Sequence, residues 1–130
     1  GTLYAKNVQK KIQPKVGLLN IGTEDSKGTE LQKQTYSLLE NAKTQGLLNF
    51  IGNVEARDVL LGDVDVVVAD GFSGNILLKS IEGTAAYMSG MLKQMFKKSL
   101  KTKIAALLCK DGLMDFKKRS GRPWRPWTAI

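Results

Sequence analysis

A chain of 130 residues, of which 42% are hydrophobic, is long enough to bury one core, and this excludes a globally disordered protein. It contains one cysteine and no histidine, which excludes internal disulfides, Ser-His-Asp or Cys-His catalytic sets and histidine-based metal sites within this sequence. The formal net charge of +8 is uneven, because residues 1–70 carry −1 and residues 71–130 carry +9. An anionic partner is therefore expected to meet the second half.

Helical and strand patterns alternate along residues 1–69. Leu3, Tyr4 and Val8 recur at helical spacing, and Pro14 follows them as a stop signal. The expected elements are a helix at 1–11, a strand at 15–20, a polar turn at 21–28, a helix at 31–44 that ends at Gly46, a strand and turn at 47–53, a helix at 54–61 and a strand at 65–69.

Short apolar strands joined by connections of helical length predict an α/β fold. Such connections form right-handed crossovers, which give a parallel sheet with helices on both faces. The turns at 20–24, 52–55 and 70–75 should then share one sheet edge and form a rim of Asn, Thr, Ser, Glu and Asp side chains. None of these turns matches a glycine-rich dinucleotide motif or a P-loop, so no sequence motif supports a nucleotide-binding site.

The turn after the third strand is the strongest candidate site. Its glycines allow a sharp turn, and Ser73 could cap a helix that begins near Asn75. A helix N-terminus favours anions, which predicts an anion site here. The alternative is an ordinary strand-to-helix turn with a capping serine. The side chains that would line the anion site are those of Asp70, Ser73, Asn75 and Lys79.

The second half predicts a long helix from residue 75 to about residue 108. Four lysines, Lys93, Lys97, Lys98 and Lys101, are expected opposite an apolar stripe of Met91, Leu92, Met95, Phe96 and Leu100. This pattern is typical of an interfacial helix on an anionic membrane. It also fits a helix packed on its own sheet or on a second subunit. A nucleic-acid groove is disfavoured, because Phe96 belongs to the apolar stripe and does not alternate with the lysines.

Residues 120–130 differ from the rest of the sequence. Arg-Pro-Trp occurs twice in tandem, and the segment has neither helical nor strand periodicity. We expect it to form a disordered tail outside the folded part, which comprises residues 1–119.

Three blocks of sequence carry a family resemblance. VGLLNIGTEDSKGTEL (16–31), GNVEARD (52–58) and DGFSGN (70–75), with the lysine-rich helix, closely resemble the C-terminal half of bacterial phosphate acyltransferases. These enzymes transfer a fatty acyl group from acyl carrier protein to inorganic phosphate for phospholipid synthesis. The resemblance implies an α/β/α sandwich similar to isocitrate and isopropylmalate dehydrogenases, usually dimeric. The family's N-terminal half, with its histidine, has no counterpart here, so the chain alone is expected to be inactive.

The resemblance also assigns roles to residues of the predicted rim. It implies no metal and no cofactor, because phosphate is itself the nucleophile, and no nucleic acid. The implied setting is the cytoplasm, with peripheral contact at the inner face of the membrane, and the implied partners are acyl carrier protein, inorganic phosphate and a second copy. Asp70 and Glu24 could orient a donor or repel phosphate. The implied catalytic residues are Asp70, Ser73, Asn75 and Lys79, the substrate-binding residues are Asn20, Gly22, Thr23, Glu24, Asn53, Gly71 and Gly74, and the membrane or carrier-protein contacts are Lys93, Lys97, Lys98 and Lys101.

Overall fold

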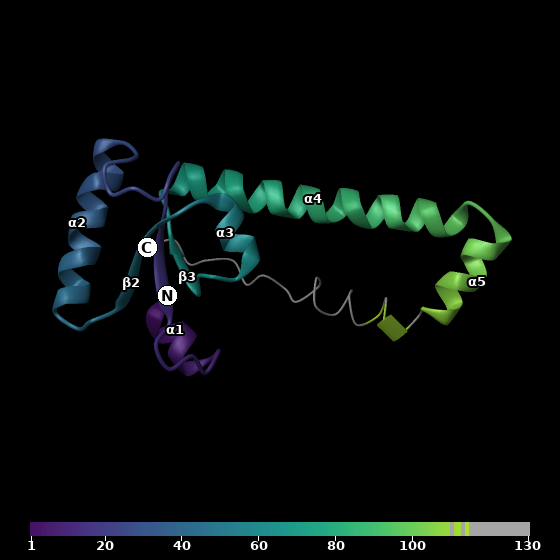
Figure 1. Cartoon of the computed structure of the whole chain (residues 1–130), viewed down its shortest axis with the longest axis horizontal. Coiled ribbons are helices and arrows are strands. Elements are labelled where there is room, and N and C mark those ends of the chain that lie inside the picture. Colours follow the sequence, from purple (N-terminus) through teal and green to yellow (C-terminus); the bar gives the residue numbers. More distant parts are fainter. Residues whose placement is uncertain (110, 113, 115–130) are drawn as a thin grey trace. The chain divides into compact units, whose positions relative to one another are not determined.

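The computed structural model describes residues 1–109, 111, 112 and 114. They divide into two compact units, Gly1–Asn75 and a second unit that begins at Ile76. The predicted tail at 120–130 lies outside the described residues. The helices and strands are α1 (Thr2–Asn7), β1 (Lys15–Leu19), α2 (Glu30–Thr44), β2 (Asn49–Val54), α3 (Ala56–Leu61), β3 (Val66–Val68), α4 (Gly71–Lys97) and α5 (Leu100–Leu108) (Figure 1).

The three strands form one parallel sheet in the order β2-β1-β3. In register, β1 pairs Val16 with Phe50 of β2 and with Val66 of β3. The predicted α/β class with a parallel sheet is confirmed, and the larger α/β/α sandwich stays a prediction. Because all three strands run the same way, their carboxyl ends share one edge, as the sequence predicted.

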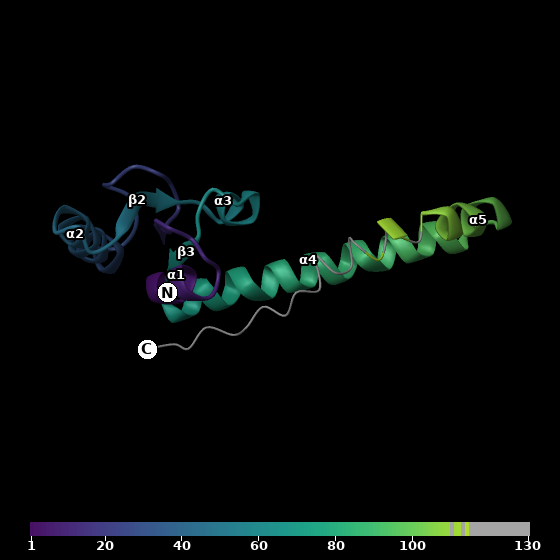
Figure 2. The ribbon, with the colours of Figure 1, turned by 90° about the horizontal axis from the view of Figure 1, so that it is seen from below.

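The core of the first unit is formed by α1 and the three strands, and α2 packs against it. Its buried residues are Ala5, Val16, Leu18, Phe50 and Val66, and Tyr36, Leu39, Leu48 and Val68 pack against them. The rings of Tyr36 on α2 and Phe50 on β2 meet edge to face with centroids 5.2 Å apart. Both views place α2 beside β2 (Figures 1 and 2). The helix predicted at 1–11 is shorter in the structure, where α1 covers Thr2–Asn7; Ala5 is its buried residue, whereas Leu3, Tyr4 and Val8 are exposed.

Strand β2 runs further than predicted. The pairing register shifts between Val16 and Gly17, so that Ile51 forms a bulge before Gly52 pairs with Gly17. Gly52 has a φ of +97°, which a side chain would resist. The expected turn at 52–55 was therefore wrong for Gly52, Asn53 and Val54, which continue the strand. Helix α3 begins at Ala56, later than predicted, because Glu55 occupies its N-cap position.

The predicted helix from residue 75 to residue 108 has two parts. The structure has α4 from Gly71 to Lys97 and α5 from Leu100 to Leu108. Ser99 caps α5, since its Oγ accepts a hydrogen bond from the backbone amide of Thr102 at 3.2 Å. At this break α5 turns away from the direction of α4 (Figure 1). Among the described helices, none is both long and apolar enough to cross a membrane.

Candidate functional site

The ends of β1 and β2 are joined by backbone contact at the carboxyl edge of the sheet. The amide of Asn20, the first residue after β1, donates to the carbonyl oxygen of Val54 at 3.0 Å. The turn that follows β1 therefore starts directly beside the end of β2. This places two of the three predicted rim segments together.

Two asparagine side chains hold the loop at residues 21–28. The Nδ2 atom of Asn20 donates to the carbonyl oxygen of Lys27 at 2.9 Å, and its Oδ1 accepts from the amide of Ile21 at 2.9 Å. From β2, the Nδ2 of Asn53 donates to the carbonyl oxygen of Glu24 at 2.6 Å. The structure thus brings Asn20, Asn53 and the Glu24 backbone together, with their hydrogen bonds directed into the loop.

Within this loop the predicted substrate-binding residues differ in exposure. Gly22 is buried, and Thr23 and Glu24 are exposed. The Glu24 carboxylate lies 3.9 Å from the Lys27 ammonium, a long and exposed ion pair that contributes little to stability. A Cβ at Gly22 would lie 2.7 Å from Glu24 Oε2, so the absent side chain leaves room for this carboxylate to fold back over the loop.

The turn between β3 and α4 is capped by Asp70. Its Oδ1 accepts hydrogen bonds from the backbone amides of Phe72 at 3.0 Å and Ser73 at 2.8 Å, and its carbonyl oxygen accepts from Gly74 at 2.9 Å. The Ser73 amide is the main reason that the pKa of Asp70 lies below its ordinary value. The predicted helix start near Asn75 with Ser73 as cap was wrong: the helix begins at Gly71 and Asp70 takes the capping position.

This cap changes what the helix start offers to an anion. The amides of Phe72, Ser73 and Gly74 are already paired with Asp70, so they are not open donors. Ser73 is half-buried, and the Asn75 side chain and Gly71 are exposed. Further along α4, the Lys79 ammonium lies 3.2 Å from Glu82 Oε2 in an exposed pair. Side-chain groups are therefore needed as further donors for an anion at this turn.

A hollow of about 210 Å³ opens between α2 and the ends of β1 and β3. Asp70 is the one predicted site residue that lines it. Gln32 and Thr35 of α2 also line it, and the sequence reasoning did not select them. Gln32 could have been found from its spacing after Thr29, because a Thr followed three residues later by Gln marks a capping box, which the structure contains. The residues around the hollow are Leu18, Leu19, Leu31, Gln32, Thr35, Val68, Ala69 and Asp70.

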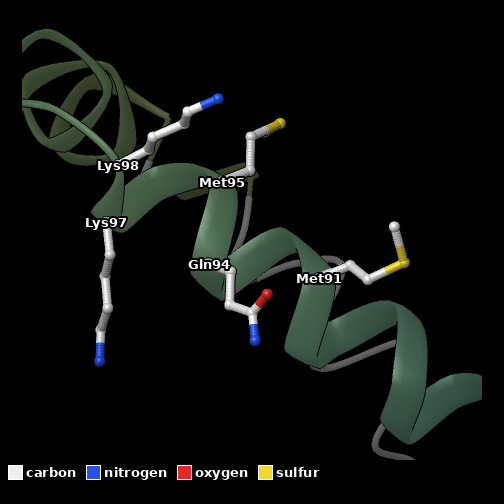
Figure 3. A pocket seen from close by; sticks show the side chains of 5 residues that line it. All are labelled: Met91, Gln94, Met95, Lys97 and Lys98. Carbon is white, nitrogen blue, oxygen red and sulfur yellow. The ribbon is translucent and has the colours of Figure 1, made fainter.

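The end of α4 carries a second hollow of about 490 Å³, lined by Met91, Gln94, Met95, Lys97 and Lys98 (Figure 3). Met91 and Met95 are about half exposed. Lys98 lies next to them, so its predicted position opposite the apolar stripe was wrong. Seven residues are almost two full helical turns, and this brings residue 98 back to the side of residue 91. Methionine and lysine side chains therefore share one surface here.

The comparisons with known proteins agree with the resemblance found from the motifs. The model of the family described as "Fatty acid synthesis protein" matches residues 1–122. A "Phosphate acyltransferase" of Lysinibacillus sphaericus (strain C3-41) is 59% identical over 117 residues, which make up 90% of this chain and 34% of that protein. A "Phosphate acyltransferase" of Streptococcus pneumoniae (strain Hungary19A-6) is 57% identical over 120 residues, or 92% of this chain and 36% of that protein.

The extent of these matches confirms the predicted family. The chain spans about a third of the length of the curated relatives it matches. Its expected position in the C-terminal half of such a protein stays a prediction.

Proposed function

The chain belongs to the family of fatty acid synthesis proteins, and from this premise we propose that it is part of an acyltransferase that moves a fatty acyl group from acyl carrier protein to inorganic phosphate. The observation that carries the proposal is the 59% identity to a phosphate acyltransferase across 90% of the chain. The product would be an acyl phosphate for phospholipid synthesis.

In this reaction the protein acts mainly by positioning the reactants and stabilising charge. An oxygen of phosphate attacks the carbonyl carbon of the thioester, the carbon–sulfur bond breaks, and the thiol of the carrier leaves. The protein has to hold an anion, stabilise the oxyanion and exclude water. A chain without histidine can contribute to such a reaction, because phosphate is itself the nucleophile.

We assign the phosphate contacts to side chains at the start of α4. Because Asp70 occupies the backbone amides of the first turn, the proposed donors are the Ser73 hydroxyl, the Asn75 amide and the Lys79 ammonium, with Gly71 and Gly74 leaving room beside them. The Asp70 carboxylate orients this turn. Asn20, Gly22, Thr23, Glu24 and Asn53 complete the rim at the neighbouring strand ends.

The basic end of the second unit is the proposed docking region. Acyl carrier protein is acidic, and lysines on a partly apolar surface suit either that partner or the anionic inner face of a membrane. The exposed Met91 and Met95 beside Lys98 support such a role (Figure 3). A homodimer is part of the same proposal. The alternative function is a non-catalytic α/β module that docks through this surface alone.

A hybrid enzyme tests the proposal. In the Lysinibacillus sphaericus protein, the segment that matches this chain is replaced by the corresponding residues of this chain, and acyl phosphate formation is measured from acyl carrier protein thioester and phosphate. We expect the hybrid to be active and the 130-residue chain alone to give no measurable product, because the chain lacks two thirds of the relatives' length. A folded but inactive hybrid would refute the acyltransferase assignment.

A further inference from the structure

We propose that Asn53 is a positioning residue, which fixes the loop at residues 21–28 over the carboxyl edge of the sheet through its Nδ2 atom. The proposal rests on the proposed function only where it says what the loop is for. Its structural part stands on hydrogen bonds and burial alone.

The side chain of Asn53 is the anchor of the loop's middle. It is the buried polar residue of the first unit, with 6% of its surface exposed, and its Nδ2 donates to the Glu24 carbonyl oxygen at 2.6 Å across 29 positions of sequence. The hydrogen bond is part-buried, so water screens it less than it screens a bond at the surface. Asn53 belongs to a strand of the sheet, so the loop is attached to a rigid element.

The oxygen of the same amide is an energetic cost, which points to the Nδ2 donor as the reason for an asparagine at this position. Within the described part of the chain, Asn53 Oδ1 is buried and has no hydrogen-bond partner. Buried acceptors without a partner are costly, and an apolar side chain at this position would avoid that cost. The hydrogen bond from Nδ2 to the Glu24 carbonyl oxygen therefore explains why an amide is present at this position. Its Oδ1, an acceptor, does not suit the oxygens of phosphate.

Asn20 clamps the two ends of the loop that Asn53 holds in the middle. Its amide contacts Ile21 at one end and Lys27 at the other. Gly28 closes the loop with a φ of +91°, and a Cβ there would lie 2.6 Å from Asn20 Oδ1. Three points of attachment leave the loop little freedom, while Thr23 and Glu24 stay exposed on it.

A clamped loop serves the proposed reaction by holding its rim in one geometry. Reacting groups must be placed to within about 0.5 Å for efficient catalysis. Asn53 thus acts through the Glu24 segment of the loop and not by touching phosphate. It is therefore a positioning residue and not a catalytic residue.

Amide hydrogen exchange in the 130-residue chain tests the clamp without any assay of activity. Asn53→Asp keeps the size of the side chain but replaces the N–H donor by a carboxylate oxygen, which repels the Glu24 carbonyl. We expect exchange at residues 23–26 to rise roughly tenfold relative to the unmodified chain near pH 7, with β1 amides unchanged. On acidification the new carboxyl gains a proton and can donate, so the difference from the unmodified chain at the same pH should shrink.

Two further variants provide controls. Asn53→Ala should raise loop exchange at every pH, because it offers no donor. Ser37→Ala removes a hydroxyl on the same unit, which donates to the Lys33 carbonyl oxygen on α2, and should leave the loop unchanged. Equal loop exchange in Asn53→Asp and the unmodified chain, or a rise spread equally over β1, would overturn the clamp.

The hybrid enzyme tests whether the clamped loop matters for the reaction. There, Asn53→Asp should raise the KM for phosphate or lower kcat near neutral pH and recover in part on acidification. Unchanged kinetics in an active hybrid, together with a loosened loop, would overturn the positioning role. An inactive hybrid would count against the proposed function, whereas the exchange data would still decide whether Asn53 clamps the loop.

Discussion

The Oδ1 atom of Asp70 accepts a hydrogen bond from the backbone amide of Ser73 at 2.8 Å, and this contact decides which residue caps α4. A substitution that removes the capping side chain should therefore destabilise the protein when it is made at Asp70, but not when it is made at Ser73. We expect Asp70→Ala to lower the free energy of unfolding by about 1 kcal/mol, as for other N-cap losses. Ser73→Ala is the matched control. It should lower the free energy of unfolding by only about a few tenths of a kcal/mol, because Ser73 does not cap the helix. Urea unfolding followed by circular dichroism measures both, and equal losses in the two variants would contradict the assignment.

Asp65 should make the stability of the first unit depend on pH in the acid range. Its Oδ2 accepts from the Lys15 amide at 2.9 Å and its Oδ1 lies 3.0 Å from the Lys11 ammonium. The Lys15 amide first, and then Lys11, lower the pKa of Asp65 below its ordinary value of 3.8. The stabilisation is therefore complete above pH 3.8 and is lost as the pH falls through the lower folded value.

Asp65→Asn tests this dependence. The variant should be less stable than the unmodified chain near pH 7 by about 1 kcal/mol, because it loses a charged acceptor. At a pH below both pKa values the two proteins should be equally stable. Thermal unfolding at a series of pH values measures the difference, and a gap that stays constant down to the lowest pH would show that the ionised carboxylate is not its cause.

Gly17 of β1 lies close to the Val54 side chain of β2. A Cβ at this position would lie 2.7 Å from Cγ1 and 2.8 Å from Cγ2 of Val54. Gly17→Ala should therefore destabilise the chain by about 1–3 kcal/mol through overpacking, and adding Val54→Ala should restore part of the loss. Gly83→Ala is the opposite control, because nothing lies within 4 Å of a Cβ there and alanine favours the helix. Similar effects at Gly17 and Gly83 in equilibrium unfolding would refute the crowding argument.

Lys79 is the cation nearest in sequence to the proposed phosphate site. In the hybrid enzyme, Lys79→Ala should weaken the use of phosphate about 100-fold if the ammonium contacts the transferring group, as for the loss of one preorganised donor. Glu82→Ala removes the carboxylate that pairs with Lys79 at 3.2 Å and should retain phosphate use. Initial rates at varied phosphate concentration measure the effect. An unchanged dependence in Lys79→Ala would remove this residue from the site.

The parallel sheet could be predicted because its strands are apolar runs and the connection at 31–44 has helical spacing. The sequence could not predict which of two residues of similar capping propensity takes a given local role. Asp70 and Ser73 are both good caps, and only the backbone path decides between them. The bulge at Ile51 left one signal, a glycine inside a strand pattern. The break at Ser99 was hidden because the apolar stripe continues across it, although Ser99 and Thr102 form a capping box.

The predicted rim was recovered in part for a similar reason. Parallel strands necessarily bring Asn20, Asn53 and Asp70 to one edge, so their neighbourhood follows from topology. Sequence does not say where each amide or carboxylate points. Both asparagines turn toward the loop at 21–28, and Asp70 turns toward its own helix, so their first partners are backbone groups.

Four lysines near the junction of α4 and α5 are the positive charges that an anionic membrane would meet. If this surface meets an anionic membrane, each lysine near it contributes on the order of 1 kcal/mol. Replacing four lysines by glutamine should then lower binding to anionic vesicles by tenfold or more, and added salt should have the same effect on the unmodified chain. The positions to change are Lys93, Lys97, Lys98 and Lys101.

A matched variant separates local from net charge. Changing Lys6, Lys27, Lys33 and Lys43 of the first unit to glutamine removes the same charge and should leave vesicle binding nearly intact. Met95→Ser should weaken binding without changing its salt dependence, because Met95 is half exposed beside Lys98 and contributes apolar contact (Figure 3). Vesicle sedimentation measures all of these variants. Equal binding to neutral and anionic vesicles, or equal losses in the two lysine sets, would refute the electrostatic role, and the surface would then be left as a contact for acyl carrier protein or a second copy.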